Sequence, residues 1–237
     1  MWFAEGNQSA RAIFTLLGFS EYPDFQVSLF LVFFTIYAVT VLGNLGMSTI
    51  IRISPKLHTP VYFLLSHLSF VDFCYFTTGT PKLLENLVVE DRTVSFTGCI
   101  MQFFLACMFA VAEAFVLAVM AYDRFVAVCK PLLYTVVMSS KLCASLVASP
   151  CTWDVVSSLT LTCFLLALSF CGPNIINNFL CEHSVIVSIS CSDPFISQVL
   201  CFAIAVFNEV SSLAIVLTTY MCILVTIIKM PSAGGAK

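Results

Sequence analysis

Charged residues are scarce in this chain. Only 10% of its 237 residues are Asp, Glu, Lys or Arg, and 60% are hydrophobic. Average soluble domains are about 25% charged and about 45–50% apolar. The apolar excess excludes a disordered chain, and the net charge of −3 excludes a basic nucleic-acid-binding protein. A soluble fold of this length cannot hide so much apolar surface from water. We therefore expect a lipid bilayer as a partner.

Catalytic motifs are also missing. The sequence has no GxSxG nucleophile motif, no HExxH zinc motif, no GxGxxG loop and no phosphate-binding P-loop. The three histidines, His58, His67 and His183, lie on separate segments. We therefore expect no enzymatic activity and no resident cofactor.

Long stretches with little or no charge dominate the chain instead. Residues 25–51 carry no charge, and a helix needs about 20 such residues to cross a hydrocarbon core of about 30 Å. Four further stretches carry a single acid each: 61–80 with Asp72, 93–122 with Glu113, 142–181 with Asp154 and 194–228 with Glu209. A lone strand in lipid would leave its backbone unpaired. We therefore predict an all-α membrane protein with five spans.

The charges between these stretches predict the segments and their orientation. The predicted segments are an N-terminal segment 1–26, helices 27–51, 60–80, 96–123 and 142–168, a loop 169–195, a helix 196–229 and the start of a further loop 230–237. Seven of the ten basic residues lie on one side, namely Arg52, Lys56, Arg124, Lys130, Lys141, Lys229 and Lys237. Basic loops face the cytoplasm, so we expect the N-terminus outside the cell.

The N-terminus agrees with that orientation. Its first residues lack the basic region of a signal peptide, so we expect the first span to act as an uncleaved signal anchor. The sequon Asn7-Gln8-Ser9 lies on the predicted external side, which makes Asn7 a candidate N-glycosylation site.

Polar residues recur at mid-membrane depth. At about 1.5 Å per residue from the cytoplasmic helix ends, Asn44, Asp72 and Glu113 lie roughly 12, 18 and 15 Å deep. Two carboxylates at one depth repel unless a cation or a shared proton relieves them. Two interpretations stay open: a sodium or proton site inside a bundle, or a hydrogen-bonded structural knot.

Two further acids are harder to interpret. Glu209 lies near the outer end of the last span beside Asn208, where it either lines a ligand cavity or ends a hydrated helix. Asp154 lies near mid-membrane beside Trp153, and the sequence offers no partner for it.

Four of the twelve cysteines fall on the predicted external side, where disulfides persist. They are Cys99, Cys171, Cys181 and Cys191. Four cysteines allow three pairings, and spacing does not choose among them. The other eight lie within spans and behave there as small apolar residues.

Several long motifs carry a family resemblance. MAYDRFVAVCKPLLY, from Met120 to Tyr134, closely resembles the third-span signature of vertebrate olfactory receptors, which are rhodopsin-like G-protein-coupled receptors. LHTPVYFLLSHLSFVDFCY, from Leu57 to Tyr75, resembles their second-span signature. Gly43-Asn44, FTLLGFSEYP, SFCGPNIINNFLCE, Thr219-Tyr220 and KMPSAGGAK match further family segments. The resemblance covers essentially the whole chain.

The resemblance implies a rhodopsin-like bundle and a role for several residues. It implies disulfides Cys99–Cys181 and Cys171–Cys191. It implies a G-protein-facing switch of Asp123, Arg124, Phe125 and Tyr220, in which Phe125 replaces the usual tyrosine and so lacks one hydroxyl. It implies a sodium-type pocket of Asn44, Asp72 and Glu113. It also implies odorant contacts by Cys107, Ala110, Val111, Ala205 and Asn208.

The resemblance also implies an activity and raises alternatives to it. Family members bind small volatile odorants at the plasma membrane and activate a stimulatory heterotrimeric G protein. They continue into a sixth and a seventh span, whereas this chain stops at Lys237, with five of the usual seven helices. A second hypothesis is therefore a non-signalling, truncated remnant that is retained in the endoplasmic reticulum, degraded, or paired with intact receptors. A third is a small transporter using Asp72 and Glu113, but the chain lacks the repeated halves common in transporters.

Overall fold

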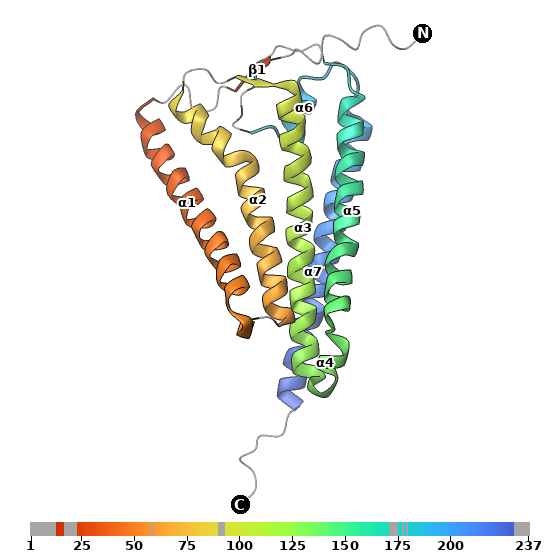
Figure 1. Cartoon of the computed structure of the whole chain (residues 1–237). Helices are drawn as coiled ribbons and strands as arrows, with labels where there is room; N and C mark the ends of the chain where they lie inside the picture. The colour runs from red at the N-terminus through yellow and green to blue at the C-terminus, as the bar shows by residue number, and fades with distance from the viewer. Residues whose placement is uncertain are drawn as a thin grey trace, which may run out of the picture.

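A computed structural model of the chain shows a bundle of long helices under a small sheet (Figure 1). It describes residues 13–16, 23–57, 59–89, 93–170, 175–176, 178 and 180–229. The long helices are α1 (Pro23–Ile53), α2 (Pro60–Val88), α3 (Phe96–Cys129), α5 (Ser140–Leu166) and α7 (Phe195–Lys229). Shorter elements are η2 (Pro55–Leu57), η3 (Pro131–Leu133), α4 (Tyr134–Val137) and α6 (His183–Ser188).

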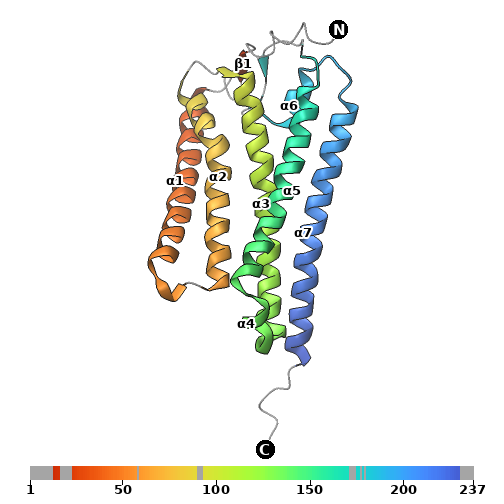
Figure 2. The same ribbon diagram turned by 45° about the vertical axis from the view of Figure 1, so that its right-hand side comes forward.

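Helix α3 lies at the centre of the bundle. It packs against α2, α5 and α7, whereas α1 packs along α2 at one edge (Figures 1 and 2). A hydrogen bond of 3.4 Å from the Tyr37 hydroxyl to Thr77 Oγ1 joins α1 to α2. Most residues predicted for the functional sites therefore lie on α3 or on a helix that contacts it.

Four helices are long and apolar enough to cross a membrane: Phe25–Ile53, Phe96–Cys129, Lys141–Leu166 and Phe195–Lys229. Among the described residues, α2 does not reach the same combination of length and apolarity, so the count of five predicted from the sequence is not reproduced. Helix α2 carries Asp72, Lys82 and Glu85 and lies between α1 and α3. Its neighbours shield part of this more polar helix.

The boundary predicted for the second helix was wrong. The predicted helix ended at residue 80, before Pro81, but α2 continues to Val88. Proline removes one backbone donor, but helices in membranes tolerate it because nearby groups satisfy the freed carbonyls. Lys82 and Glu85 pair at 3.1 Å on the turn after Pro81 and add a local contact there.

Serine side chains define two helix starts. Ser95 Oγ accepts a hydrogen bond from the Gly98 backbone at 3.1 Å and begins α3. Ser139 Oγ accepts one from Leu142 at 3.4 Å and begins α5. Each cap satisfies one backbone N–H that has no partner within its own helix.

The sheet was not expected from the sequence. Strand β1 (Ile13–Leu16) lies between β2 (Thr93–Ser95), which is antiparallel to it, and β3 (Ile175–Ile176), which is parallel. Phe14 pairs with Val94 in the first ladder. The N-terminal strand thus links two loops far apart in sequence. We call this end of the bundle the sheet end.

A buried cluster lies at the sheet end. The Phe14 ring lies 6.0 Å from the Phe96 ring, and Phe96 lies 5.0 Å from Phe170. These aromatic rings pack with Leu165 of α5 and with Ile186 of α6. The cluster connects the strand, the loop helix and the ends of α3 and α5.

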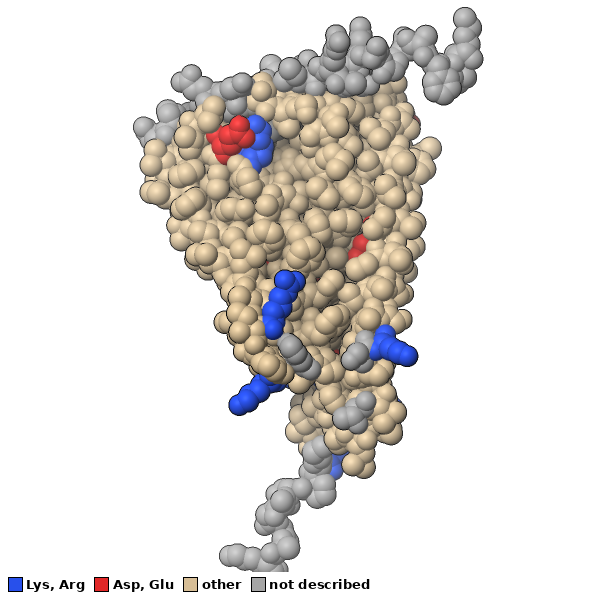
Figure 3. All heavy atoms as spheres, viewed as in Figure 1, with Lys and Arg blue, Asp and Glu red and all other residues tan. Residues whose placement is uncertain are grey.

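The opposite end, which we call the α4 end, holds a smaller cluster. Val126, Met138 and Cys143 are buried there, with Tyr134 and Phe125 packed against them. Figure 3 shows Lys and Arg side chains gathered towards this end, below a broad and nearly uncharged belt. This distribution agrees with the positive-inside pattern read from the sequence.

Candidate functional site

A disulfide ties the long loop at the sheet end to α3. Cys99 and Cys181 are bonded and both are buried, as the family resemblance implied. One turn further along α3, Gln102 Oε1 accepts a hydrogen bond from the Cys181 backbone at 3.4 Å. Cys191 is also disulfide-bonded. Cys171, its expected partner, and the sequon residue Asn7 lie outside the described residues.

The loop is further fixed at α6. His183 Nε2 lies 3.0 Å from Ser197 Oγ at the start of α7, and its ring lies 6.1 Å from that of Phe103 on α3. Burial lowers the pKa of His183 below its ordinary value. The imidazole is therefore neutral at pH 7 and can bond the serine hydroxyl in either tautomer.

A cavity of about 250 Å³ lies under this loop, between α2 and α3. Phe76 and Gly79 of α2, Gln102 and Ala106 of α3, and Leu180 of the loop are among its lining residues. A Cβ at Gly79 would lie 3.1 Å from Leu180 Cδ2 and 3.2 Å from Gln102 Nε2, so glycine permits the loop to approach α2. This cavity was not predicted, because no local sequence pattern indicates that Gly79 and Leu180 lie close together.

The odorant-contact residues predicted on α3 share one helix face. Cys107, Ala110 and Val111 follow the i, i+3, i+4 spacing, which puts them on one side of α3. Cys107 and Val111 are half-buried, and Ala110 is exposed. Cys107 and Cys201 of α7 both pack against the sheet-end cluster.

The candidates on α7 differ from each other. Ala205 is exposed, whereas Asn208 is only 2% exposed. Asn208 Oδ1 accepts a hydrogen bond from Trp153 Nε1 of α5 at 2.9 Å. Its Nδ2 is buried and has no hydrogen-bond partner among the described residues. The amide therefore has a fixed orientation, and both N–H groups of its Nδ2 are unused.

The sodium-type pocket brings two carboxylates together. Asp72 of α2 and Glu113 of α3 are half-buried and close enough to interact electrostatically. Asp72 Oδ1 is buried and finds no hydrogen-bond partner within the described part of the chain. Asn44 is half-buried on α1, which packs against α2. An unpartnered carboxylate oxygen beside a second acid fits a monovalent cation, which prefers oxygen ligands.

The residues predicted to form a G-protein-facing switch lie at the α4 end. Asp123 is 1% exposed, and its Oδ1 accepts a hydrogen bond from the Tyr134 hydroxyl at 3.0 Å. Burial and this bond raise the pKa of Tyr134 to about 12, so the phenol stays a donor at pH 7. Arg124 is exposed and, within the described residues, forms no ion pair with Asp123. Tyr134 was not among the residues predicted for the switch, although it is the last residue of the motif MAYDRFVAVCKPLLY.

The last two switch residues lie in different environments. Phe125 is half-buried and packs against the Val126, Met138 and Cys143 cluster, an apolar site that needs no hydroxyl. Tyr220 of α7 is 55% exposed.

The comparisons with known proteins agree with this geometry. The olfactory receptor family profile matches residues 33–237. Olfactory receptor 5D13 of Homo sapiens is 67% identical over the whole chain, which covers 76% of that receptor. Olfactory receptor 1165 of Mus musculus is 63% identical over 98% of the chain and 73% of the receptor. Olfactory receptor 5D18 of Homo sapiens is 62% identical over the whole chain and 75% of the receptor.

The chain belongs to the olfactory receptor family. It is therefore a multi-pass membrane protein of a family of odorant receptors that signal through G proteins, and it is not an enzyme. The olfactory receptor chain spans about three quarters of the length of these relatives.

The buried acid on α5 of this olfactory receptor chain belongs neither to the odorant-contact residues nor to the predicted switch. Asp154 of α5 is 1% exposed, and neither carboxylate oxygen has a hydrogen-bond partner among the described residues. One turn along, the buried Ser158 Oγ is likewise unpartnered there. A buried polar group without a partner is costly, so Asp154 is expected to weaken α5.

Proposed function

We propose that this chain binds small volatile odorants at the sheet end and presents its α4 end to a G protein. The observation that carries the proposal is the loop held over α3 by the Cys99–Cys181 disulfide and by Gln102, above the row Cys107, Ala110 and Val111. The placement of basic residues supports a plasma-membrane orientation with the sheet end outside.

The polar group at this site suggests the ligand chemistry. The surrounding side chains are mostly apolar, and the unused Nδ2 of Asn208 is a hydrogen-bond donor. An apolar body with one acceptor oxygen, as in an aldehyde, ketone or ester, fits this combination. The separate cavity between α2 and α3, which Asn208 does not line, measures about 250 Å³ and is smaller than the roughly 300–1,000 Å³ of most ligand pockets, so it admits only a small molecule.

Photochemical cross-linking tests the binding site. The purified chain in lipid nanodiscs is irradiated with an aliphatic ketone that carries a diazirine, and labelled peptides are mapped by mass spectrometry. We expect labels on α3 between residues 102 and 111 and on α7 near Asn208, competed by unlabelled ketone. Ala110→Trp should reduce them, and the control Ala127→Val near the α4 end should not. Labels spread over α1 without competition would refute the site.

We propose that the G protein is stimulatory and that residues 1–237 alone do not activate it. The resemblance implies that the switch works against helices that correspond to the unmatched quarter of the relatives. We also propose that this polypeptide alone is largely retained in the endoplasmic reticulum, where it can pair with an intact receptor chain. A ligand-dependent rise in cAMP in cells that express only residues 1–237 at the surface would refute the signalling proposal.

We further propose that Asp72 and Glu113 hold a sodium ion, with Asn44 nearby. The unpartnered Asp72 Oδ1 supports this. Sodium chloride should raise the Tm of the purified chain more than choline chloride does, and Asp72→Asn should abolish the difference. The exposed control variant Asp193→Asn should keep it. Equal Tm values in both salts for the unmodified chain would refute the ion site.

A further inference from the structure

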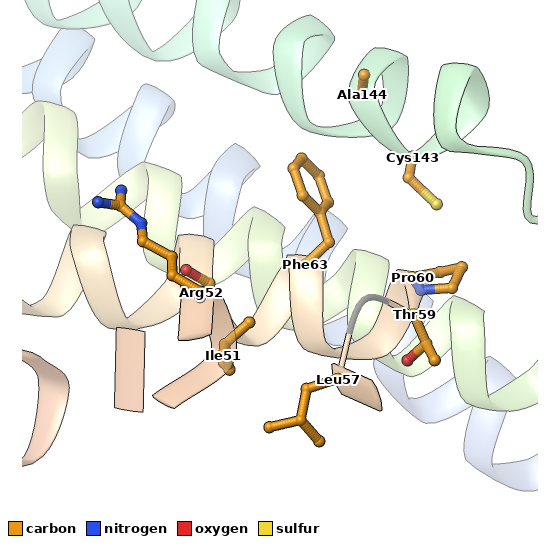
Figure 4. Close-up of a pocket in the computed structure, with 9 residues that line it drawn as sticks. Ile51, Arg52, Leu57, Thr59, Pro60, Phe63, Cys143 and Ala144 are labelled. Atoms are coloured by element: carbon orange, nitrogen blue, oxygen red, sulfur yellow. The ribbon is translucent and has the colours of Figure 1, made fainter. Parts of the chain in front are cut away.

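A second and larger cavity lies at the α4 end, far from the odorant-contact residues. It measures about 480 Å³ and lies between the end of α1, the start of α2 and the start of α5 (Figure 4). Neither the odorant site nor the switch uses its lining residues. Its position at the ends of two candidate membrane spans, α1 and α5, places it at a membrane surface.

The walls of the cavity are mainly apolar. Ile51 of α1, Phe63 of α2 and Ala144 of α5 line it. In Figure 4 the Phe63 ring points from α2 towards Ala144 and Cys143 on α5. Phe63 nevertheless remains 48% exposed, so its ring offers an apolar surface that neighbouring helices do not cover.

The charge at the cavity has one sign. Arg52 lines it at the end of α1, together with the hydroxyl-bearing Thr59 and Ser66. Lys56 and Lys141 are exposed and lie one and two positions, respectively, before the lining residues Leu57 and Cys143. No acid occurs in residues 52–71 or 140–153, which supply most of the lining. Among the described residues, the lining of the cavity therefore combines a guanidinium, two hydroxyl groups and apolar walls and contains no carboxylate.

We propose that this cavity binds an anionic glycerophospholipid of the cytoplasmic leaflet, such as phosphatidylserine. A guanidinium matches phosphate oxygens with paired donors, and Thr59, which also lines the cavity, supplies a hydroxyl donor for a polar part of the head group. The first part of an acyl chain lies against Phe63 and Ala144. Anionic lipids are concentrated in the cytoplasmic leaflet and attract basic residues at the membrane surface. The proposal rests on the orientation given under the proposed function, which places the α4 end in the cytoplasm.

Lipid binding to the full chain tests the proposal. Native mass spectrometry of the purified chain in detergent compares phosphatidylserine with phosphatidylcholine of identical acyl chains. We expect about tenfold tighter binding of phosphatidylserine, which corresponds to one charge-assisted pair. Arg52→Gln should reduce this preference to nearly the phosphatidylcholine value. Lys229→Gln, a matched loss of one exposed cation at the end of α7, should leave it unchanged.

Two further experiments distinguish binding in the cavity from attraction by surface charge, and binding of the whole lipid from binding of its phosphate group alone. Ala144→Trp fills the cavity and should weaken binding of phosphatidylserine, while formation of the Cys99–Cys181 disulfide reports that the variant folds. Inorganic phosphate should not displace the lipid, because it lacks the apolar portion. Equal binding of both lipids, an unchanged preference in Arg52→Gln, or displacement by inorganic phosphate would overturn the proposal.

Orientation is measured separately. In the chain that reaches the cell surface, isolated by surface biotinylation, a cysteine placed by Lys56→Cys should react with an impermeant maleimide only after cells are permeabilised. Reaction in intact cells would refute the orientation, and with it the leaflet proposed here. Loss of lipid selectivity with the correct orientation would refute only the lipid site, and odorant cross-linking at the sheet end would be unaffected.

Discussion

Replacing Asp154 with valine should stabilise the protein. The aspartate is 1% exposed within α5, and both carboxylate oxygens lack hydrogen-bond partners among the described residues. The buried hydroxyl of Ser158, one turn away, is not bonded to it. Valine has no polar atom to satisfy, so the substitution removes the penalty, and its slightly larger volume offsets part of that gain.

The magnitude follows from the position of Asp154 in a membrane-spanning helix. At a helix centre, aspartate costs about 2.5–3.5 kcal/mol on the translocon insertion scale and valine contributes about −0.3 to −0.6 kcal/mol. Asp154→Val should therefore make insertion of α5 more favourable by about 3–4 kcal/mol. In the folded chain the gain should be about 1–3 kcal/mol, the usual cost of a buried polar group without a partner.

Two assays measure these quantities. Glycosylation mapping of residues 140–166 in an insertion reporter gives the inserted fraction, and thermal unfolding of the purified chain in detergent gives Tm. The control Thr152→Val changes an exposed hydroxyl bonded within its own helix, and should shift the unfolding free energy by no more than about 0.5 kcal/mol. Asp154→Val with unchanged insertion or a lower Tm would refute the reasoning, because the carboxyl would then be making a favourable contact.

The remaining predictions concern three polar contacts. Trp153→Phe removes the 2.9 Å bond to Asn208 and leaves that buried amide without its donor, so it should cost about 1–3 kcal/mol in thermal unfolding; an unchanged Tm would contradict this. Tyr134→Phe and Asp123→Asn should be coupled by about 1–3 kcal/mol in a double-mutant cycle, and strict additivity would show that the 3.0 Å bond contributes nothing. Because burial lowers the pKa of His183 below 6.5, the unfolded chain binds more protons, so Tm should be highest above pH 6.5 and fall as the pH drops through the lowered value. His183→Gln should remove this part of the pH dependence, and an identical profile for the variant would exclude His183 as its source.

Features that depend on local composition could be predicted from the sequence. Uncharged runs located α1, α3, α5 and α7, because crossing a bilayer requires a long apolar helix whatever its neighbours are. The end of the bundle where basic residues gather could also be predicted, because it depends only on which loops carry Lys and Arg. The Cys99–Cys181 disulfide came only from the family resemblance, since spacing left three pairings open.

Features that depend on contacts between distant segments could not be predicted. Strand β1 forms by pairing with residues 93–95 and 175–176, and no local pattern names such partners. The bond between Trp153 and Asn208 joins residues 55 positions apart, so the sequence showed two polar groups but not their pairing. Helix α2 passes through Pro81 because packing outweighs the local preference of proline for a helix end.

Odorant-evoked cAMP from a completed receptor shows most directly whether this chain forms part of an odorant-binding, G-protein-coupled receptor. Residues 1–237 are joined to the part of olfactory receptor 5D13 that the chain does not cover, and cAMP is measured against an odorant panel at matched surface expression. The account predicts a ligand-dependent rise that Ala110→Trp shifts to higher odorant concentration, and that Arg124→Ala abolishes while odorant cross-linking persists. A response unchanged by both substitutions, or no response from a surface-expressed receptor to any odorant that activates intact 5D13, would contradict it.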